Sequence, residues 1–413
     1  MRILFCSRRY FPAVSGMSVY AANLLHELVA AGHDVTMVSQ YRADEAGTRI
    51  YGGGPPPPVP GVRVIGRRSC GEEAGGDFER DIDDMREVIR AEHARQPFDL
   101  LHAQYGYPNG WSVLLAAREL GLPCVVSIQG GDGHWVGSCC EMHRLAMVRV
   151  IEQANAVLIG CESFAGEVVD RLGVARSRFT IVPGAVDVGR FKPEPGREAA
   201  DGLGRAADPV RLLYHGRVDR RKGALDFIEA LARLRDEAVR FAATISGIGP
   251  DLDASRALVA ERGLSQAVRF TGAAEYDRAP AAYHEQDVFV SPTYMEGFSN
   301  TVLEAMASGL PIVSCHAVGV MDCLRDGENG LLVQPGDVPA LAAALRRMIG
   351  DPALRRRLAQ AALAECRATY GWEPVGRQIM QVYAGVLGTP PPDGFDPMLP
   401  RSPCRYRDAP HLL

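Results

Sequence analysis

Hydrophobic residues in the first forty positions alternate between strand-like and helix-like patterns. RILFCS (2–7) is a short apolar run, whereas MSVYAANLLHELVAA (17–31) repeats its apolar side chains at helical spacing. Gly32 is placed to end that helix, and HDVTMVS (33–39) has the composition of a second strand. The segment therefore predicts a βαβ unit, whose crossover should be right-handed.

Two series of such segments follow one another along the 413 residues. In the first series the predicted strands are FDLLHAQY, PCVVSIQ, AVLIG and FTIVPGAV, and the predicted helices span 110–120, 141–154 and 162–172. In the second series the predicted strands are VRLLYHG, RFAATISG, AVRFTG, DVFVSP, PIVS and GLLVQP, and the predicted helices span 223–235, 251–262, 278–285, 301–308, 338–349, 352–368 and 372–387. Strands that alternate with helices in this way predict an α/β fold with open, doubly wound parallel sheets.

Composition divides the chain at three places. Residues 41–80 and 188–208 are rich in glycine, proline and charge, so we expect a long flexible loop at the first and an interdomain linker at the second. Because a chain of this length exceeds one ordinary core, we expect two domains, at 1–190 and 207–371. The proline-containing segment 389–413 is expected to be a disordered tail.

Charge and hydropathy bear on the class of partner. The net charge is −5 and there is no basic block, which argues against nucleic acid. The start of the sequence lacks the apolar region of a signal peptide, and no stretch reaches the ~18 apolar residues of a membrane span. We therefore expect a cytoplasmic protein, and leave open its peripheral association with the inner face of the membrane.

Cysteine and lysine usage gives two narrower hints. Ten cysteines without CxxC spacing predict reduced thiols. Cys139 and Cys140 are adjacent and His143 follows them, but this spacing matches no usual zinc motif, so we expect no metal. Lys192 and Lys222 are the only lysines among the 45 basic residues, which draws attention to the positions that they occupy.

Loops at the expected carboxyl ends of the strands carry candidate binding groups. Gly16 directly precedes a predicted helix, where a ligand can approach backbone N–H groups, although a tight βα turn is the simpler interpretation. In YHGRVDRRKG, Arg217 and Lys222 follow a turn at Gly216. Two cations here suit a diphosphate, and the alternative is a solvated basic loop.

The stretch SPTYMEGFSNTVLEAMASGLPIVS (291–314) carries two carboxylates, Glu296 in a loop and Glu304 inside the predicted helix. Asn300 is the expected N-cap, so the amides of residues 298–301 should be open to phosphate or sugar oxygens. A carboxylate accepts two hydrogen bonds and therefore suits the vicinal hydroxyls of a ribose or hexose. The alternative is that both acids complement the helix dipole or belong to a solvated face.

In combination, these motifs resemble those of the family 4 glycosyltransferases, which are retaining enzymes of GT-B fold. The resemblance covers nearly the whole chain and rests, in order, on FPAVSGMSVYAANLLHELVAAGHDVTMVS, RFTIVPGAVDVGRFKP, GRVDRRKGALDFIEAL, SGIGP, VRFTG, DVFVSPTYMEGFSNTVLEAMASGLPIV and DGENGLLVQPGD. It implies two Rossmann-like domains that face each other across a cleft. The N-terminal, acceptor-side domain would be completed by a returning helix within 372–388, and the C-terminal domain would bind the donor.

The resemblance also implies roles for individual residues. Arg217 and Lys222 would neutralise the diphosphate leaving group, and Glu296 would contact the transferred sugar, so these three are the expected catalytic residues. Glu304 would hold the ribose hydroxyls of the donor. The other expected donor-binding residues are Gly16, Phe298, Ser299, Asn300 and Thr301.

Some positions depart from the family pattern. Met17 replaces a usual glycine, and Gln129 stands where many members carry a histidine after a strand. Asp132 and His134 are nearby polar candidates for substrate contacts, and Asp322 lies in a stretch where the family often has an acid. These departures concern the acceptor and the transferred sugar more than the donor phosphates.

The resemblance therefore implies a hexosyltransferase (class EC 2.4) that uses a nucleotide diphosphate sugar, retains the anomeric configuration and needs neither metal nor other cofactor. The acceptor would be a small molecule, a lipid-linked compound or a glycan, belonging to the cell envelope or to secondary metabolism. Two alternatives stay open, a nucleotide-sugar epimerase of the same fold and a non-catalytic nucleotide-sugar-binding subunit. An NAD-dependent dehydrogenase is disfavoured because the chain lacks GxGxxG after its first strand.

Overall fold

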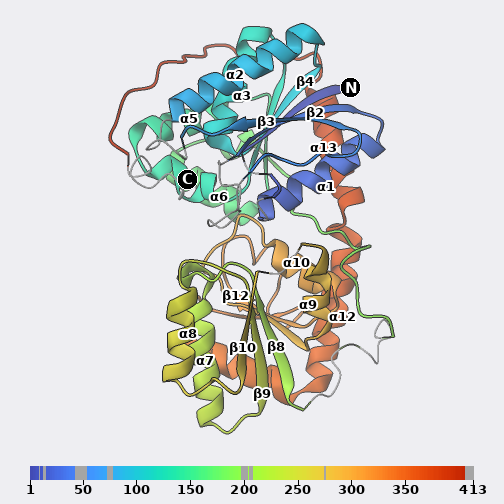
Figure 1. The fold of residues 1–413 in the computed structure, drawn as a ribbon, viewed down its shortest axis with the longest axis vertical. Coiled ribbons are helices and arrows are strands. Elements are labelled where there is room, and N and C mark those ends of the chain that lie inside the picture. The colour runs from blue at the N-terminus through green and yellow to red at the C-terminus, as the bar shows by residue number, and fades with distance from the viewer. Residues whose placement is uncertain are drawn as a thin grey trace. The chain divides into compact units, whose positions relative to one another are not determined.

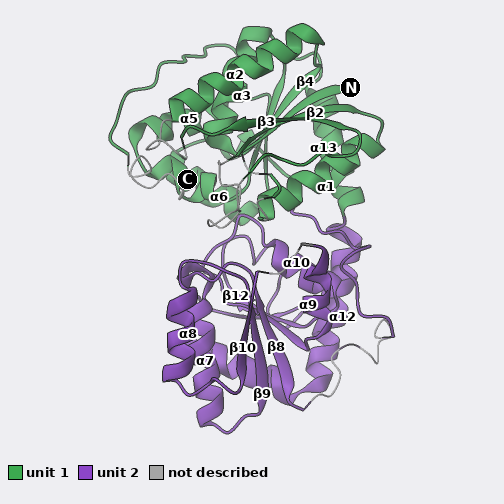
Figure 2. Ribbon diagram, viewed as in Figure 1, with its two compact units in different colours: residues 1–183, 372–413 green, residues 184–371 purple. Residues whose placement is uncertain are grey.

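The chain folds around two parallel β-sheets, each with helices packed against it (Figure 1). The computed structural model describes residues 1–8, 10–12, 15–41, 54–71, 78–196, 203, 208–273 and 276–404. Unit 1 consists of residues 1–183 and 372–413, and unit 2 of residues 184–371 (Figure 2).

Unit 1 contains a seven-stranded parallel sheet in the order β3-β2-β1-β4-β5-β6-β7. Its strands are β1 (Arg2–Ser7), β2 (Asp34–Tyr41), β3 (Val62–Arg68), β4 (Leu100–Gln104), β5 (Cys124–Ile128), β6 (Ala156–Ile159) and β7 (Phe179–Ile181). Its helices are α1 (Gly16–Ala30), α2 (Phe78–Arg95), α3 (Trp111–Leu120), α4 (Gly131–His134), α5 (Glu141–Gln153), α6 (Glu162–Leu172) and α13 (Trp372–Val386). Short helical turns are η1 (Gly106–Gly110), η2 (Val136–Ser138) and η3 (Arg176–Arg178).

Unit 2 contains a six-stranded parallel sheet in the order β10-β9-β8-β11-β12-β13. Its strands are β8 (Val210–His215), β9 (Phe241–Ser246), β10 (Val268–Gly272), β11 (Val288–Ser291), β12 (Ile312–Cys315) and β13 (Leu331–Val333). Its helices are α7 (Ala224–Asp236), α8 (Leu252–Glu261), α9 (Ala279–His284), α10 (Asn300–Ala307), α11 (Val338–Gly350) and α12 (Pro352–Thr369), with short turns at η4 (Arg220–Lys222) and η5 (Tyr276–Arg278).

The strand order of each sheet reverses beside its first strand, between β1 and β4 in unit 1 and between β8 and β11 in unit 2. Loops that follow neighbouring parallel strands at such a reversal leave a crevice at the carboxyl edge, where ligands of α/β proteins bind. The central strands consist of apolar runs because both of their faces are covered. Ile3, Leu4 and Phe5 of β1, for example, are fully buried.

Helix α13 packs in unit 1 although it follows all of unit 2 in the sequence. The ring of Trp372 lies 5.0 Å from that of Tyr20 on α1. Further along α13, the Tyr383 hydroxyl is hydrogen-bonded to Nδ1 of His102 on β4 at 2.5 Å, and Nε2 of His102 contacts Ser127 Oγ on β5 at 2.7 Å. Burial lowers the pKa of His102 to about 3, so this ring is neutral.

The loop predicted over 41–80 contains a strand, and the following helix α2 was also missed by the sequence pattern. Strand β3 pairs with β2 at the edge of the sheet, where several of its side chains are exposed. Its sequence, VRVIGRR, therefore lacks the apolar run that marks a central strand. The rest of the predicted loop includes 42–53 and 72–77, which lie outside the described residues.

The linker predicted at 188–208 lies within unit 2, which begins at Gly184. Val186, just before the predicted linker, and Phe191, near its start, are buried in a core cluster of that unit, so this part of the chain packs into unit 2. Residues 197–202 and 204–207 of the predicted linker lie outside the described residues.

From the end of α13 to residue 404 the chain has no helix or strand, but it contacts the rest of unit 1. Arg149 Nη2 on α5 lies 2.8 Å from Asp396 Oδ2, and the Met142 amide donates to Ser402 Oγ at 3.1 Å. The expected tail is therefore bound along α5 as far as the structure describes it, because α5 offers partners that the composition of the tail does not reveal. Among the described residues, no helix is long and apolar enough to cross a membrane.

Candidate active site

The loop after β8 reaches the end of β11 through a close backbone contact. Residues 220–222 form a short turn that Gly223 ends with φ +71°. A Cβ at Gly223 would lie 2.0 Å from the carbonyl oxygen of Pro292. Because only glycine permits both this conformation and this approach, Gly223 places Lys222 beside the loop that follows β11.

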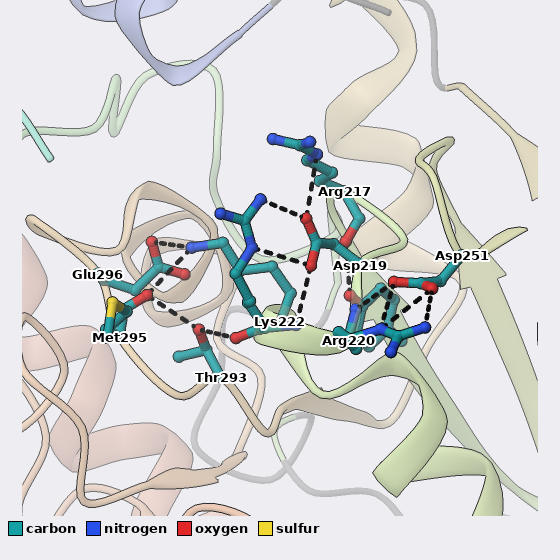
Figure 3. Close-up of polar contacts among 10 residues, drawn as sticks. Arg217, Asp219, Arg220, Lys222, Asp251, Thr293, Met295 and Glu296 are labelled. Carbon is teal, nitrogen blue, oxygen red and sulfur yellow. Dashed lines mark hydrogen bonds and ion pairs between the residues drawn. The ribbon is translucent and has the colours of Figure 1, made fainter. Parts of the chain in front are cut away.

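Lys222 forms an ion pair with Glu296 (Figure 3). Its Nζ lies 2.7 Å from Glu296 Oε2 and donates to the carbonyl of Met295 at 3.1 Å. The backbone of Glu296 is held in turn, since its amide donates to the carbonyl of Val318 at 2.8 Å. Gly319 has φ +75°, and a Cβ there would lie 2.2 Å from the Glu296 carbonyl oxygen. Gly223 thus permits the position of Lys222, and Gly319 permits that of Glu296.

Asp219 organises the arginines of the same loop (Figure 3). Its buried carboxylate lies 2.7 Å from Arg221 Nη2 and 3.5 Å from Arg217 Nε. Burial by itself would raise the pKa of Asp219, but hydrogen bonds from Arg221 and the charges of both arginines lower it below its usual value. Arg220 instead pairs with Asp251 at 2.9 Å. Asp219 was not among the residues predicted for the site, although it is an acid within a basic loop.

Helix α10 begins beside this group, with a different cap from the one predicted. Ser299 is the N-cap and Asn300 the first helical residue. The amide of Ser299 donates to the carbonyl of Gly319 at 3.3 Å, so it is not one of the open amides expected over 298–301. Thr301 and Val302 precede the first amide that bonds within the helix, so no carbonyl of α10 accepts from their N–H groups.

Phe298 is anchored by its side chain. Its ring lies 5.7 Å from that of Tyr370, and a Cβ at Gly184 would come within 2.6 Å of it. The half-buried ring therefore fixes the loop before α10 and leaves the backbone of that loop as the part that can meet a ligand.

Glu304 is hydrogen-bonded to a tyrosine, whereas Glu296 forms an ion pair with a lysine. Its Oε2 accepts a hydrogen bond of 2.6 Å from the hydroxyl of Tyr283 on α9. The buried Tyr283 ring also lies 5.4 Å from that of His215, at the end of β8. Burial raises the pKa of Glu304 to about 7, although the Tyr283 hydroxyl and the charge of Arg190 act to lower it. The sequence pattern did not point to Tyr283.

Gly16 and Gln129 lie at the carboxyl edge of the unit 1 sheet. Gly16 is the exposed first residue of α1, and the Ser15 side chain caps that helix. Gln104, which ends β4, donates through Nε2 to the carbonyl of Met17 at 2.9 Å and lies 3.5 Å from Gln129 Oε1. The structure thus brings the two candidates to one edge through Gln104.

Asp132 and His134, two candidates for substrate contacts, are buried within unit 1. The Asp132 carboxylate accepts hydrogen bonds from the amides of Gly106, at 2.7 Å, and of Gln129, at 3.0 Å. His134 Nδ1 lies 2.9 Å from Glu167 Oε2. The Asp132 carboxylate and Nδ1 of His134 therefore hold the loop after β5 through contacts inside the unit.

Comparison with known proteins decides the family. The model of the glycosyl transferases group 1 matches residues 197–364, and that of the glycosyl transferase 4-like domain matches residues 15–185. A D-inositol 3-phosphate glycosyltransferase from Nocardioides sp. is 30% identical over 323 residues, which cover 72% of this chain and 70% of that protein. The chain belongs to the family 4 glycosyltransferases. Glycogen synthase from Mycobacterium tuberculosis is 28% identical over 410 residues, 93% of this chain and 94% of that protein.

The fold of this glycosyltransferase agrees with its family. A solved structure of an Anabaena protein in complex with UDP-glucose matches with a TM-score of 0.69 and 19% identity, and covers 93% of this chain and 100% of that chain. Two parallel α/β units of this kind confirm the predicted GT-B fold class. Membership of the family also confirms that the chain is a glycosyltransferase enzyme.

Proposed function

We propose that this glycosyltransferase moves a hexosyl-type sugar from a nucleotide diphosphate sugar to an acceptor, with retention of the anomeric configuration. The observation that carries the proposal is the Lys222–Glu296 ion pair at the carboxyl edge of β8 and β11, with Arg217 on the same loop as Lys222. Two cations and the start of α10 lie at the strand-order reversal of unit 2, where an α/β sheet binds its ligand.

In this proposal Arg217 and Lys222 hold the diphosphate. Arginine offers a planar fork and lysine a compact charge, so the pair can contact both phosphates. The amides of Thr301 and Val302 add donors at the positive end of α10. As the bond to the sugar breaks, negative charge grows on the leaving diphosphate, and these groups stabilise it in place of a divalent cation.

The acids and the loop before α10 then bind the remainder of the donor. Glu296 exchanges the Lys222 ammonium for hydroxyls of the transferred sugar once phosphate engages that lysine. Glu304, ionised, accepts hydrogen bonds from the ribose hydroxyls. The backbone of Phe298, with Ser299 and Asn300, would complete the donor site in unit 2.

For the retaining step we infer a front-face substitution, by analogy with the family. The acceptor oxygen forms a bond to the anomeric carbon on the face from which the diphosphate leaves. The electron pair of the broken C–O bond goes to the departing phosphate oxygen, and this oxygen takes the proton of the acceptor hydroxyl. Arg217 and Lys222 lower the energy of this step by countering the charge on the leaving group.

A screen of donors and acceptors can be chosen from the relatives of the chain. The Anabaena structure in complex with UDP-glucose supports a nucleotide-sugar donor and makes UDP-glucose the first to test. The two relatives are named for different products, glycogen and a glycosylated inositol phosphate, so both kinds of acceptor belong in the screen. Gln129, half-buried at the edge of unit 1, is the proposed acceptor-side contact.

The test is a thermal-shift screen of the purified chain with UDP-, GDP-, ADP- and dTDP-sugars, followed by transfer assays with the donor that binds. We expect one nucleotide to stabilise the chain and the product to keep the anomeric configuration of the donor, as read by NMR. Isomerisation of the donor without an acceptor would identify an epimerase instead. Inversion of configuration would overturn the proposed step, and donor binding without transfer or hydrolysis would support a non-catalytic subunit.

A further inference from the structure

Three cysteines and one histidine of unit 1 converge at the start of α5. Cys139 Sγ lies 4.0 Å from Cys140 Sγ and 3.0 Å from His143 Nδ1. Cys404, from the segment after α13, places its Sγ 3.6 Å from the same His143 nitrogen. All four ligand atoms lie within 4.8 Å of one another. We propose that these four side chains bind a structural zinc ion.

Three of the six distances between the four ligand atoms are near the edges of a tetrahedral zinc site, and all six are within 4.8 Å. With Zn–S bonds of about 2.3 Å and Zn–N bonds of about 2.0 Å, the edges of the tetrahedron are about 3.8 Å between sulfurs and about 3.5 Å between sulfur and nitrogen. The observed 4.0, 3.0 and 3.6 Å lie close to these edges. A disulfide would need sulfurs about 2.05 Å apart, and each of these cysteines is a thiol.

The chemistry of the donors selects the metal. Three thiolates and one imidazole form a closed set of soft and borderline ligands, which is the usual donor set of structural zinc. Three thiolates this close repel one another unless a cation lies between them, and a divalent metal keeps coordinating thiols deprotonated. The four proposed zinc ligands belong to unit 1. Arg217 and Lys222, which are proposed to counter the charge of the diphosphate, belong to unit 2.

The fold prepares three of the ligands. Cys140 is the N-cap of α5, and the amide of His143 points to its Sγ at 3.5 Å, where the helix dipole favours a thiolate. The ring of His143 is buried and lies 4.2 Å from that of Tyr107, which sets its orientation. Cys139 ends the turn η2 just before the helix.

The fourth ligand explains why the end of the chain returns to this point. Cys404 is 8% exposed, whereas most side chains of the segment that leads to it are exposed. Such a segment buries little apolar surface with which to order itself. Figure 1 shows the red trace leaving α13 and running around unit 1 towards α5. A metal bond to Cys404 would fasten this segment, and it would also fix the far end of the loop that starts at Gln129.

Metal analysis of the full chain tests the site. The protein is produced in zinc-supplemented medium, purified without a histidine tag and kept reduced by a phosphine. We expect elemental analysis to find one zinc per chain. Replacement by Co²⁺ should give the thiolate charge-transfer bands and strong visible absorption of a tetrahedral sulfur-rich site. Another metal at full occupancy, or no uptake of Zn²⁺ and Co²⁺ by reduced protein, would overturn the proposal.

A pair of matched cysteine variants separates metal binding from helix capping. Cys140 and Cys161 are both N-caps of unit 1 helices, α5 and α6, and serine caps a helix well. Cys140→Ser should weaken zinc binding by more than about 100-fold, since even residues behind the ligands matter by 10–100-fold. Cys161→Ser should keep full zinc. Equal zinc affinity in the two variants would refute the assignment.

Cys404→Ser provides a variant that leaves the core of unit 1 intact. We expect the same loss of zinc affinity, together with faster amide hydrogen exchange in residues 389–404. A chelator should speed exchange in this segment of the unchanged protein and have no such effect in the variant. Exchange that is unaffected by the chelator, or an intact mass lower by two hydrogens, which indicates a disulfide, would each contradict the zinc site.

Discussion

The ammonium of Lys222 lies 2.7 Å from a carboxylate oxygen of Glu296, and the side chains are 32% and 18% exposed (Figure 3). A partly exposed ion pair of this kind contributes about 1 kcal/mol or less to folding. Stability therefore gives little reason for the contact. Without donor, the Glu296 carboxylate neutralises the charge of Lys222. A diphosphate that binds Lys222 must therefore replace this carboxylate. The pair thus makes donor binding an exchange of partners, which two variants can detect.

Lys222→Ala should lower the rate of transfer from the donor by about 10²–10³-fold, the usual loss when one preorganised group that stabilises developing charge is removed. The leaving diphosphate would lose its compact cation, while the fold should persist because the pair adds little stability. Steady-state kinetics with the donor found by screening provides the measurement. A rate near that of the unchanged enzyme would remove Lys222 from the mechanism.

Arg220→Ala is the matched control for that variant. Arg220 belongs to the same turn as Lys222, but its side chain is 72% exposed and pairs with Asp251 at 2.9 Å. Removing it takes the same unit of charge from the loop without touching the Lys222–Glu296 pair. Transfer by this variant should stay within a few-fold of normal. A loss as large as that of Lys222→Ala would mean that overall loop charge, and not the position of one cation, supports the reaction.

Glu296→Gln should separate sugar recognition from phosphate binding. The variant has a neutral side-chain amide in place of the carboxylate that competes with phosphate for Lys222. A nucleoside diphosphate without its sugar should therefore bind at least as tightly as it does to the unchanged enzyme. Transfer should nevertheless fall, because the charged acceptor for the sugar hydroxyls is gone. Calorimetry with UDP, set beside the transfer rate, tests both statements. Much weaker UDP binding would show that Glu296 acts mainly by positioning Lys222.

The periodicity of the sequence was enough to predict most strands and helices, because central strands are continuous apolar runs and the helices are amphipathic. β3 escaped because its edge position lets charged residues alternate through it. The start of the predicted linker packs into unit 2 because Phe191, within the polar stretch, is buried there. No local pattern reports which unit a polar segment will pack against.

At the site, the sequence showed which residue types were present but not their partners. Lys222 and Glu296 were both predicted, whereas their ion pair depends on the close approach of Gly223 to Pro292. Tyr283 contacts Glu304 across two helices, 21 positions away in the sequence. Such contacts are set by tertiary packing, for which a single sequence carries no spacing rule.

Unit 1 should lose stability in acid because of His102. Burial lowers the pKa of His102 to about 3 from its usual 6.5, so only the unfolded chain takes up this proton between those values. The contribution of neutral His102 to the free energy of unfolding is present in full above pH 6.5. It is lost as the pH falls, at up to about 1.4 kcal/mol per pH unit.

Denaturation of unit 1 can be followed by tryptophan fluorescence, since Trp111, Trp135 and Trp372 all belong to that unit. His102→Gln should reduce the loss of stability between pH 6.5 and pH 4. Tyr383→Phe removes the hydroxyl next to the ring but keeps the buried histidine, and should retain the loss. An equal pH dependence in His102→Gln and the unchanged chain would assign the acid sensitivity to other groups.

Glu304 should give unit 2 the opposite dependence. Burial raises the pKa of its carboxyl from 4.5 to about 7, so the folded unit keeps a proton that the unfolded chain releases. Stability should therefore fall as the pH rises from 4.5 through 7, by about 3 kcal/mol at most. Hydrogen exchange of α10 and its neighbours measures this within unit 2. Glu304→Gln should remove this loss of stability at rising pH. If stability depended on pH equally in the variant and the unchanged chain, the loss would belong to other groups.

The Glu304 carboxyl should make the affinity for the donor increase with pH. Ribose hydroxyls donate to the ionised form, so donor affinity should increase as the pH rises through 7, and binding below that pH should release a proton. Calorimetry in buffers of different ionisation enthalpy measures both effects.

Tyr283→Phe should move the midpoint of this pH dependence upwards, because the Tyr283 hydroxyl lowers the pKa of Glu304. In Glu304→Gln the affinity should be weak and insensitive to pH. Proton release that persists in this variant would exclude Glu304 as the ribose acceptor, since its side chain can no longer ionise.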